Sequence, residues 1–252
     1  MNTPRQYIEL FHLLFLEQLS QKLDKKLYCL KGGCNLRFFL KSMRYSEDID
    51  LDVQTIAKET LRNKITNILQ STPFLQILES RNIRIATISE PKQTETTQRW
   101  KLQLQIPKTS LLLQTKIEFS RRDSILNHNL EIMDKDIIRA YHLTPIYINH
   151  YSADAAFIQK INALVMRNQT QARDIFDLHH LLSYIQSPAL PPTIISRIDE
   201  AKQNAMSISF EEFKSQVVAY LLPEYQLLYN DALIWDDMVL KVMESLDNYA
   251  TN

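Results

Sequence analysis

The spacing of apolar and polar residues predicts a succession of helices and short strands in the first half of the chain. Near the N-terminus apolar side chains recur three and four positions apart, which indicates an amphipathic helix with Thr3 as its cap and Pro4 in its first turn. The apolar run over residues 27–30 is typical of a buried strand. Residues 35–40 and 56–69 are then expected to form helices.

Residues 48–53 alternate acidic and apolar side chains. In a strand, residues two apart share a face, so Asp48, Asp50 and Asp52 are predicted to point the same way while the apolar residues between them enter the core. Three carboxylates on one face repel one another, and a divalent cation between them would relieve that repulsion. Hard oxygen ligands suit Mg²⁺. The alternative is an acidic edge strand that discourages aggregation.

Gly32 and Gly33 are the two glycines of a 252-residue chain, whereas average composition would give about 18. They stand between the predicted strand over residues 27–30 and the predicted helix over residues 35–40. Glycine permits positive φ and lets main-chain N–H groups approach a ligand closely, so this corner is a candidate phosphate cradle. A plain tight turn between two packed elements is the alternative.

The chain then takes on β character. Three strands are predicted, over residues 83–88, 100–106 and 111–119. Residues 91–97, between the first two, are predicted to form a polar hairpin loop. Lys116, Glu118 and Ser120 share one face of the last strand. Glu118 would supply a third metal-binding carboxylate if this strand lies beside residues 48–53, and otherwise belongs to an ordinary exposed face.

From about residue 152 the pattern becomes helical. Lys160 and Asp174 are 14 positions apart, roughly 21 Å along an unbroken helix, so they can share a site only if the chain turns within residues 168–171. Thr170 is the predicted cap of the helix after that turn. Arg173 and Asp177, four apart, are expected to pair. Further helices are predicted over residues 193–206, 210–222 and 231–249.

These patterns predict an α+β fold in two domains, an α/β domain over residues 1–145 and a helical bundle over residues 146–252. Lys plus Arg and Asp plus Glu both number 29, so a nucleic-acid partner must meet a local basic patch. Two cysteines without a metal-binding pattern favour a reduced, cytoplasmic protein. No signal peptide or membrane span is expected.

Six short segments follow one another in a specific order between residues 30 and 182: Leu30-Lys31-Gly32-Gly33, Leu36-Arg37, Ser46-Glu47-Asp48-Ile49-Asp50, Lys116-Ile117-Glu118, Lys160-Ile161-Asn162-Ala163-Leu164 and Arg173-Asp174-Ile175-Phe176-Asp177-Leu178. In this order they resemble the AbiEii/AbiGii-type toxin nucleotidyltransferases of the DNA polymerase β-like nucleotidyltransferase superfamily. The resemblance implies a nucleotidyltransferase-like mixed β-sheet flanked by helices, followed by a C-terminal helical bundle. Departures from the family pattern stand at Cys34, Asn35 and Glu118.

The resemblance also implies a reaction, the transfer of a nucleoside monophosphate from an NTP to an acceptor such as RNA, in particular tRNA. The protein would be the toxin of a bacterial toxin–antitoxin pair, with an antitoxin as its partner. Two Mg²⁺ or Mn²⁺ ions would be held by Asp48, Asp50 and Glu118. The implied nucleotide-binding residues are Gly32, Gly33, Arg37, Ser46, Lys116 and Lys160, and Asp174 would orient Lys160 or the acceptor.

Other interpretations of the same residues stay open. The acceptor could be a protein or a small molecule, or the chain could be a non-catalytic binding module that retains the fold. Arg37 and Lys116 could be ordinary surface charges. Lys160 and Asp174 could be a surface lysine and a helix N-terminal acid.

Overall fold

The computed structural model describes residues 3–107, 109, 111–123, 125, 127–186 and 188–250. The chain forms two compact units. The first comprises residues 1–41 and 45–151, and the second comprises residues 42–44 and 152–252.

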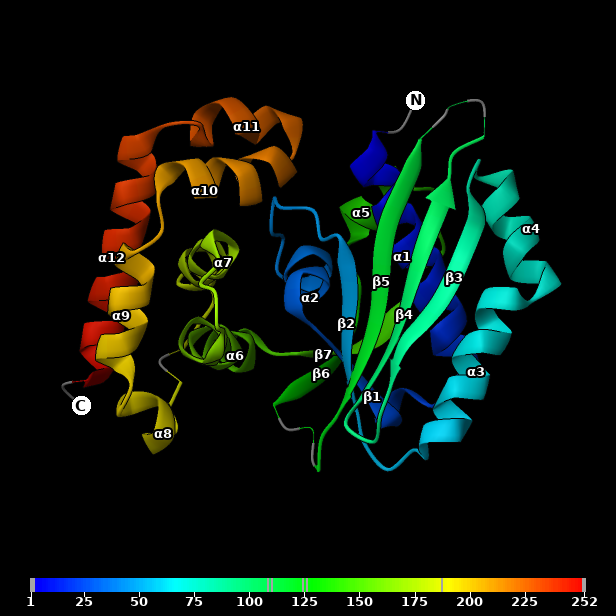
Figure 1. The fold of residues 1–252 in the computed structure, drawn as a ribbon, viewed down its shortest axis with the longest axis horizontal. Helices are drawn as coiled ribbons and strands as arrows, with labels where there is room; N and C mark the ends of the chain where they lie inside the picture. Colours follow the sequence, from blue (N-terminus) through cyan, green and yellow to red (C-terminus); the bar gives the residue numbers. More distant parts are fainter. Residues whose placement is uncertain are drawn as a thin grey trace. The chain divides into compact units, whose positions relative to one another are not determined.

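A seven-stranded mixed sheet organises the first unit, with the strand order β3-β4-β5-β2-β1-β7-β6 (Figure 1). Two strand pairs, β2–β5 and β1–β7, are parallel, and the other neighbours are antiparallel. The mixed sheet predicted from the sequence is therefore confirmed. Its strands are β1 (Tyr28–Lys31), β2 (Asp48–Val53), β3 (Arg84–Gln93), β4 (Thr97–Gln105), β5 (Leu112–Arg121), β6 (His128–Ile132) and β7 (Tyr147–Tyr151).

Helices α1, α3 and α4 cover one face of this sheet and bury its apolar side chains (Figure 1). In β2, Ile49, Leu51 and Val53 are fully buried on that face, as the alternation predicts. The helices and short 3-10 segment of the first unit are α1 (Pro4–Lys22), η1 (Lys25–Leu27), α2 (Gly32–Phe39), α3 (Lys58–Gln70), α4 (Thr72–Ser80) and α5 (Lys135–Ala140). Thr3 caps α1 by accepting from the Gln6 N–H, as predicted.

Some boundaries differ from the sequence prediction. Helix α2 begins at Gly32 itself, so the glycines form its first turn rather than a turn before it. The predicted loop over residues 91–97 is shorter, because β3 extends to Gln93 and the turn closes through a 2.9 Å bond from the Thr94 N–H to the Thr97 carbonyl. The sequence pattern did not predict strand β6, because nearly all of its residues are exposed and the strand shows no extended apolar pattern.

The second unit is helical, with an aromatic centre in which the rings of Phe213 and Trp235 stack at 4.4 Å. Residues 42–44 also belong to this unit, and Arg44 forms an isolated antiparallel β-bridge with Leu221. The predicted cap Thr170 is wrong by one residue, because α7 is preceded by Gln171. The elements are α6 (Ala153–Met166), α7 (Ala172–Leu181), α8 (Pro192–Ile195), α9 (Ile198–Met206), α10 (Phe210–Gln216), η2 (Val218–Tyr220), α11 (Pro223–Tyr229) and α12 (Ala232–Ala250).

Two of the predicted C-terminal helices are divided in the structure. The segment over residues 193–206 becomes α8 and α9, and the segment over residues 210–222 becomes α10 and η2. Across the described part of the chain, every helix is too short or too polar to traverse a lipid bilayer.

Helix α1 carries a polar residue, His12, into the core, where it is 1% exposed. Its Nε2 atom lies 2.8 Å from the Thr115 hydroxyl of β5. Burial lowers the pKa of His12 from 6.5 to about 3, because a charged imidazole would lose its hydration. The ring is therefore neutral in the folded protein.

This burial predicts a pH-dependent stability. As pH falls from 6.5 toward about 3 the unfolded chain takes up a proton at His12 that the folded chain excludes. The free energy of unfolding should fall by an extra amount of about 1.4 kcal/mol per pH unit. Urea unfolding of wild type and His12→Leu across this range measures the difference. Parallel profiles for the two proteins would contradict a neutral buried His12.

Candidate functional site

Strand β2 presents Asp48 and Asp50 on the face opposite its buried residues. Their side chains are 32% and 31% exposed, whereas Ile49 between them is fully buried. The predicted sharing of one face is confirmed. Two carboxylates on alternate residues of a strand cannot move far apart, so their mutual repulsion is built into the site.

Gly32 brings the start of α2 against this acid pair. Its φ is +68°, in the left-handed region that favours glycine. A Cβ atom at this position would lie 3.2 Å from Asp50 Oδ2, closer than an ordinary contact. The backbone conformation therefore favours glycine, and a larger residue would also press on the carboxylate beside it. Gly33 follows in the first turn of α2.

Strand β5 lies parallel to β2 and places two charged residues beside the acids. Lys116 is opposite Asp48 in the register, and Glu118 is opposite Asp50. The Lys116 Nζ atom is 3.2 Å from Asp48 Oδ2 and 3.9 Å from Asp50 Oδ1. The placement of Glu118 beside the aspartate strand, left open by the sequence, is thus settled.

A neighbour that the sequence did not indicate, Arg99 of β4, holds Glu118 at an Nε–Oε2 distance of 2.5 Å. Alternation along β4 places Arg99 on the same face as Lys101. Only the strand register, which was not predictable, brings Arg99 opposite Glu118.

The electrostatics of the site favour a cation. Burial raises the pKa of Asp50, and the neighbouring charges of Asp48 and Glu118 raise it further, while Lys116 and Lys31 oppose them. A carboxylate that is costly to ionise gains most from a positive charge beside it.

The acid pair fits a hard divalent cation. Oxygen atoms of Asp48 and Asp50 already converge on one positive group, the Lys116 ammonium, and carboxylate oxygens are the ligands that Mg²⁺ prefers. Within the described residues, no three His, Cys, Asp or Glu side chains are grouped closely enough to hold a metal ion. A third ligand would have to come from Glu118 after it leaves Arg99, from water, or from a bound phosphate.

Asp52, the last acidic residue of β2, has a different environment from Asp48 and Asp50. It is 2% exposed and contacts Lys31 at 2.5 Å, Arg122 at 3.2 Å and the Tyr151 hydroxyl at 2.8 Å. Its charge is therefore neutralised by the chain itself, and it joins β1, β2 and β7.

Two predicted nucleotide ligands have protein partners in the structure. The Arg37 Nε atom donates to Glu9 at 2.6 Å, and its guanidinium lies 5.1 Å from the centroid of the Tyr45 ring. Its side chain is 11% exposed and that of Glu9 is 3% exposed, so Arg37 is neither an ordinary surface charge nor directed into the acid pair. The Ser46 hydroxyl donates to the Asp48 carbonyl at 2.9 Å.

Lys160 and Asp174 lie together in the second unit, because the chain turns between α6 and α7 as the sequence required. The Lys160 Nζ atom is 3.0 Å from Asp174 Oδ1 and 2.6 Å from Asp177 Oδ2, and both carboxylates are fully buried. The surface-lysine interpretation of Lys160 is thus wrong, since its side chain is 12% exposed.

Asp177 also binds Arg44, at 2.9 Å, and this replaces the predicted pair between Asp177 and Arg173. Burial opposes ionisation of Asp177, but Arg44 and Lys160 hold its pKa below the ordinary value. Arg44 lies 133 residues from Asp177 along the chain, so local sequence patterns did not indicate this contact.

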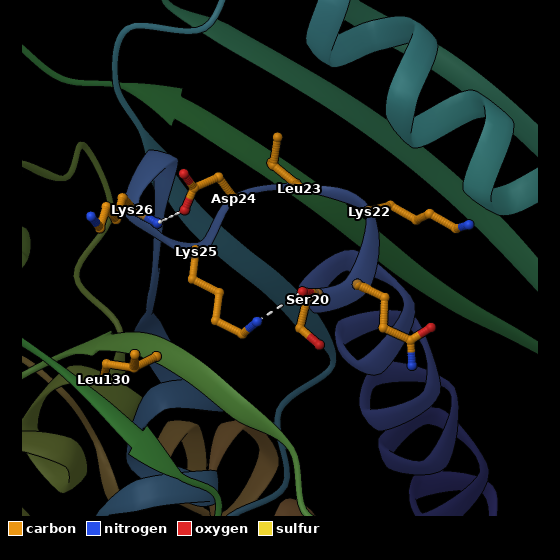
Figure 2. A pocket seen from close by; sticks show the side chains of 8 residues that line it. Ser20, Lys22, Leu23, Asp24, Lys25, Lys26 and Leu130 are labelled. Atoms are coloured by element: carbon orange, nitrogen blue, oxygen red, sulfur yellow. Dashed lines mark hydrogen bonds between the residues drawn. The ribbon is translucent and has the colours of Figure 1, made fainter.

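A pocket of about 400 Å³ opens at the end of α1 (Figure 2). It contains none of the predicted site residues. In Figure 2 Lys22 and Lys26 extend in opposite directions, and the Lys25 ammonium donates to the Ser20 carbonyl at 3.0 Å. These cations do not converge, so the pocket is not assembled as a phosphate site.

Comparison with solved structures shows that the fold recurs in bacterial proteins. JHP933 from Helicobacter pylori is 18% identical, with a TM-score of 0.62, over 100% of this chain and 97% of that one. MenT4, the nucleotidyltransferase toxin Rv2826c from Mycobacterium tuberculosis H37Rv, is 14% identical, with a TM-score of 0.64, over 98% of this chain and 86% of that one. No curated protein matches the sequence.

A family model for the nucleotidyl transferase AbiEii toxin of type IV toxin–antitoxin systems matches residues 14–234. The match spans most of the chain and both compact units. It includes the acid pair of β2, the glycine corner and the lysine–aspartate cluster of α6 and α7. The chain therefore belongs to the AbiEii nucleotidyl transferase toxin family.

Proposed function

We propose that this chain transfers the nucleoside monophosphate of an NTP to an RNA acceptor, in particular tRNA, at a Mg²⁺- or Mn²⁺-dependent site formed around Asp48 and Asp50. The observation that carries the proposal is the convergence of these two carboxylates on one cation beside the Gly32 corner. Family membership supports nucleotidyl transfer as the reaction class.

In this proposal Asp48 and Asp50 would hold the metal, which would lower the pKa of the attacking hydroxyl and neutralise charge on the phosphates, including the pyrophosphate that leaves. Main-chain N–H groups of Gly32 and Gly33, at the start of α2, bind the triphosphate. Lys116, which contacts both carboxylates, would be available to bind a phosphate oxygen once a metal took its place. Glu118 would be a further ligand if its contact with Arg99 were released.

The contacts of Lys160, Asp174 and Arg37 support a structural role for these residues. The ammonium of Lys160 is neutralised by Asp174 and Asp177, and Arg37 is neutralised by Glu9. We propose that each stabilises its own unit. A direct contact of Lys160 or Arg37 with phosphate, and an orienting role of Asp174, stay predictions from the sequence, as does a hydroxyl contact from Ser46.

Family membership supports a proposal for the biological role. As a toxin of the AbiEii type, the protein would act in the cytoplasm and be opposed by a cognate antitoxin. Transfer to a protein or to a small molecule is the alternative use of the same site. A non-catalytic binding module is disfavoured because the repulsion between Asp48 and Asp50, only partly compensated by Lys116, stays costly unless a further cation binds.

Incubation of the protein with total RNA, Mg²⁺ and each α-labelled NTP tests the proposal. The wild type should label RNA, and Asp48→Ala should abolish labelling because half of the metal-binding pair is lost. Asp136→Ala, which removes an exposed carboxylate of α5, is the matched control and should label normally. Labelling that persists in a folded Asp48→Ala variant would exclude the metal role, and labelling confined to added protein or small-molecule acceptors would favour the alternative substrates.

Gly32→Ala tests the glycine corner. The new Cβ would be strained at φ +68° and would press on Asp50 Oδ2, so transfer should fall roughly tenfold to a hundredfold through misplacement of the acid pair. Gly33 has no positive φ, and Gly33→Ala should leave the free energy of unfolding at or above that of wild type. Full labelling activity in Gly32→Ala would show that the close approach to Asp50 is not needed.

Lys160→Met tests the stabilising role. Removing this ammonium leaves Asp174 with only Arg167 and Asp177 with only Arg44 as cationic partners, which should lower the free energy of unfolding by up to about 3 kcal/mol. Lys241→Met breaks an exposed pair with Asp237 and should cost less than about 1 kcal/mol. Urea denaturation measures both variants, and equal costs would contradict a structural ion cluster around Lys160.

A further inference from the structure

A buried hydrogen-bond network lies behind the acid pair, on the side of the sheet covered by α1. It contains His12, Thr115 and Cys34, which are 1%, 4% and 1% exposed. Three elements contribute, since His12 is on α1, Thr115 on β5 and Cys34 on α2. A neutral polar group enclosed in this way must be satisfied by partners of its own.

The order of donors in the network follows from its geometry. The Thr115 hydroxyl donates its one hydrogen to the Glu47 carbonyl at 2.7 Å. Its oxygen therefore accepts from His12 Nε2, 2.8 Å away. A neutral imidazole then carries no hydrogen on Nδ1, which faces the Cys34 sulfur at 3.6 Å. Burial raises the pKa of Cys34, so the sulfur keeps its hydrogen and can donate it.

The network ends on the two peptide groups that flank Asp48. The Glu47 carbonyl, in the peptide before Asp48, accepts from Thr115. The Asp48 carbonyl, in the peptide after it, accepts from Ser46 at 2.9 Å and lies 3.2 Å from the Cys34 sulfur, whose single hydrogen is shared between this carbonyl and His12 Nδ1. Anchoring both peptides fixes the backbone dihedrals of Asp48, and thereby the direction of its Cα–Cβ bond.

We propose that His12 is a positioning residue for the metal-binding acid pair, acting through Thr115 and Cys34 on the two peptides of Asp48. The inference rests on the metal role proposed above for Asp48 and Asp50. His12 touches neither carboxylate. It holds the backbone from which the first carboxylate projects, as outer partners commonly do for metal ligands.

Binding of Mn²⁺ to the nucleotide-free chain, followed by electron paramagnetic resonance, tests the inference without relying on catalysis. His12→Leu, which removes both ring nitrogens, should weaken Mn²⁺ binding about tenfold or more. Thr115→Val, which keeps the shape and removes the hydroxyl, should act in the same direction. His12→Gln restores a donor toward Thr115 and should bind Mn²⁺ within about threefold of wild type.

Leu16→Ala provides the matched control for a merely structural effect. Leu16 lies on the same helix, is fully buried, and has no hydrogen bond to the network. Its truncation should lower the midpoint of thermal unfolding and leave Mn²⁺ affinity unchanged when measured below that midpoint. Equal weakening in Leu16→Ala and His12→Leu, or no weakening in His12→Leu, would overturn the positioning role and leave the proposed function standing.

The ring tautomer supplies a second readout. Nitrogen NMR of histidine-labelled wild type should show the hydrogen of His12 on Nε2, and a hydrogen on Nδ1 would overturn the donor order. A wild type that binds no Mn²⁺ would contradict the proposed function itself and remove the basis of this inference with it.

Discussion

Asp48 and Asp50 repel each other, and a single short strand gives them no means of separating. Their shared face is set by the alternation of β2, whose intervening residue Ile49 is fixed in the core. Around this pair the rest of the first unit supplies compensation: Lys116 from the parallel strand, and the N-terminus of α2 brought close by the absence of a Cβ at Gly32. In the proposed function, a divalent cation would extend the same compensation to a bound triphosphate.

In the ion cluster of the second unit the acidic residues are fully buried and paired with cationic side chains. There one ammonium, Lys160, lies between two fully buried carboxylates, and Arg44 shares the charge of Asp177. The charge of this cluster is compensated within the protein, since Arg167 also lies 3.2 Å from Asp174 Oδ2, whereas the charge of the β2 acid pair is only partly compensated by Lys116. In the proposed function, the cluster of the second unit stabilises its own unit and the acid pair of β2 binds the incoming ligand.

Local patterns predicted much of this chain, because the alternation of β2 and the helical spacing of α1 are decided by nearby residues. The same is true of the turn between α6 and α7. Contacts between residues distant in sequence were beyond prediction. Strand register brings Arg99 to Glu118, and the tertiary fold brings Arg37 to Glu9 and Arg44 to Asp177. His12 did leave a signal, since a polar residue on the apolar stripe of a helix requires a buried partner.

The central claim is that the acid pair is a cation site. A crystal of the protein with Mn²⁺ and a non-hydrolysable NTP analogue tests it through the anomalous scattering of manganese. The account predicts a manganese peak bound by Asp48 and Asp50, with Lys116 moved from the carboxylates to the phosphates. A nucleotide bound elsewhere, with the Lys116 ammonium still between the two acids and no manganese beside them, would contradict it.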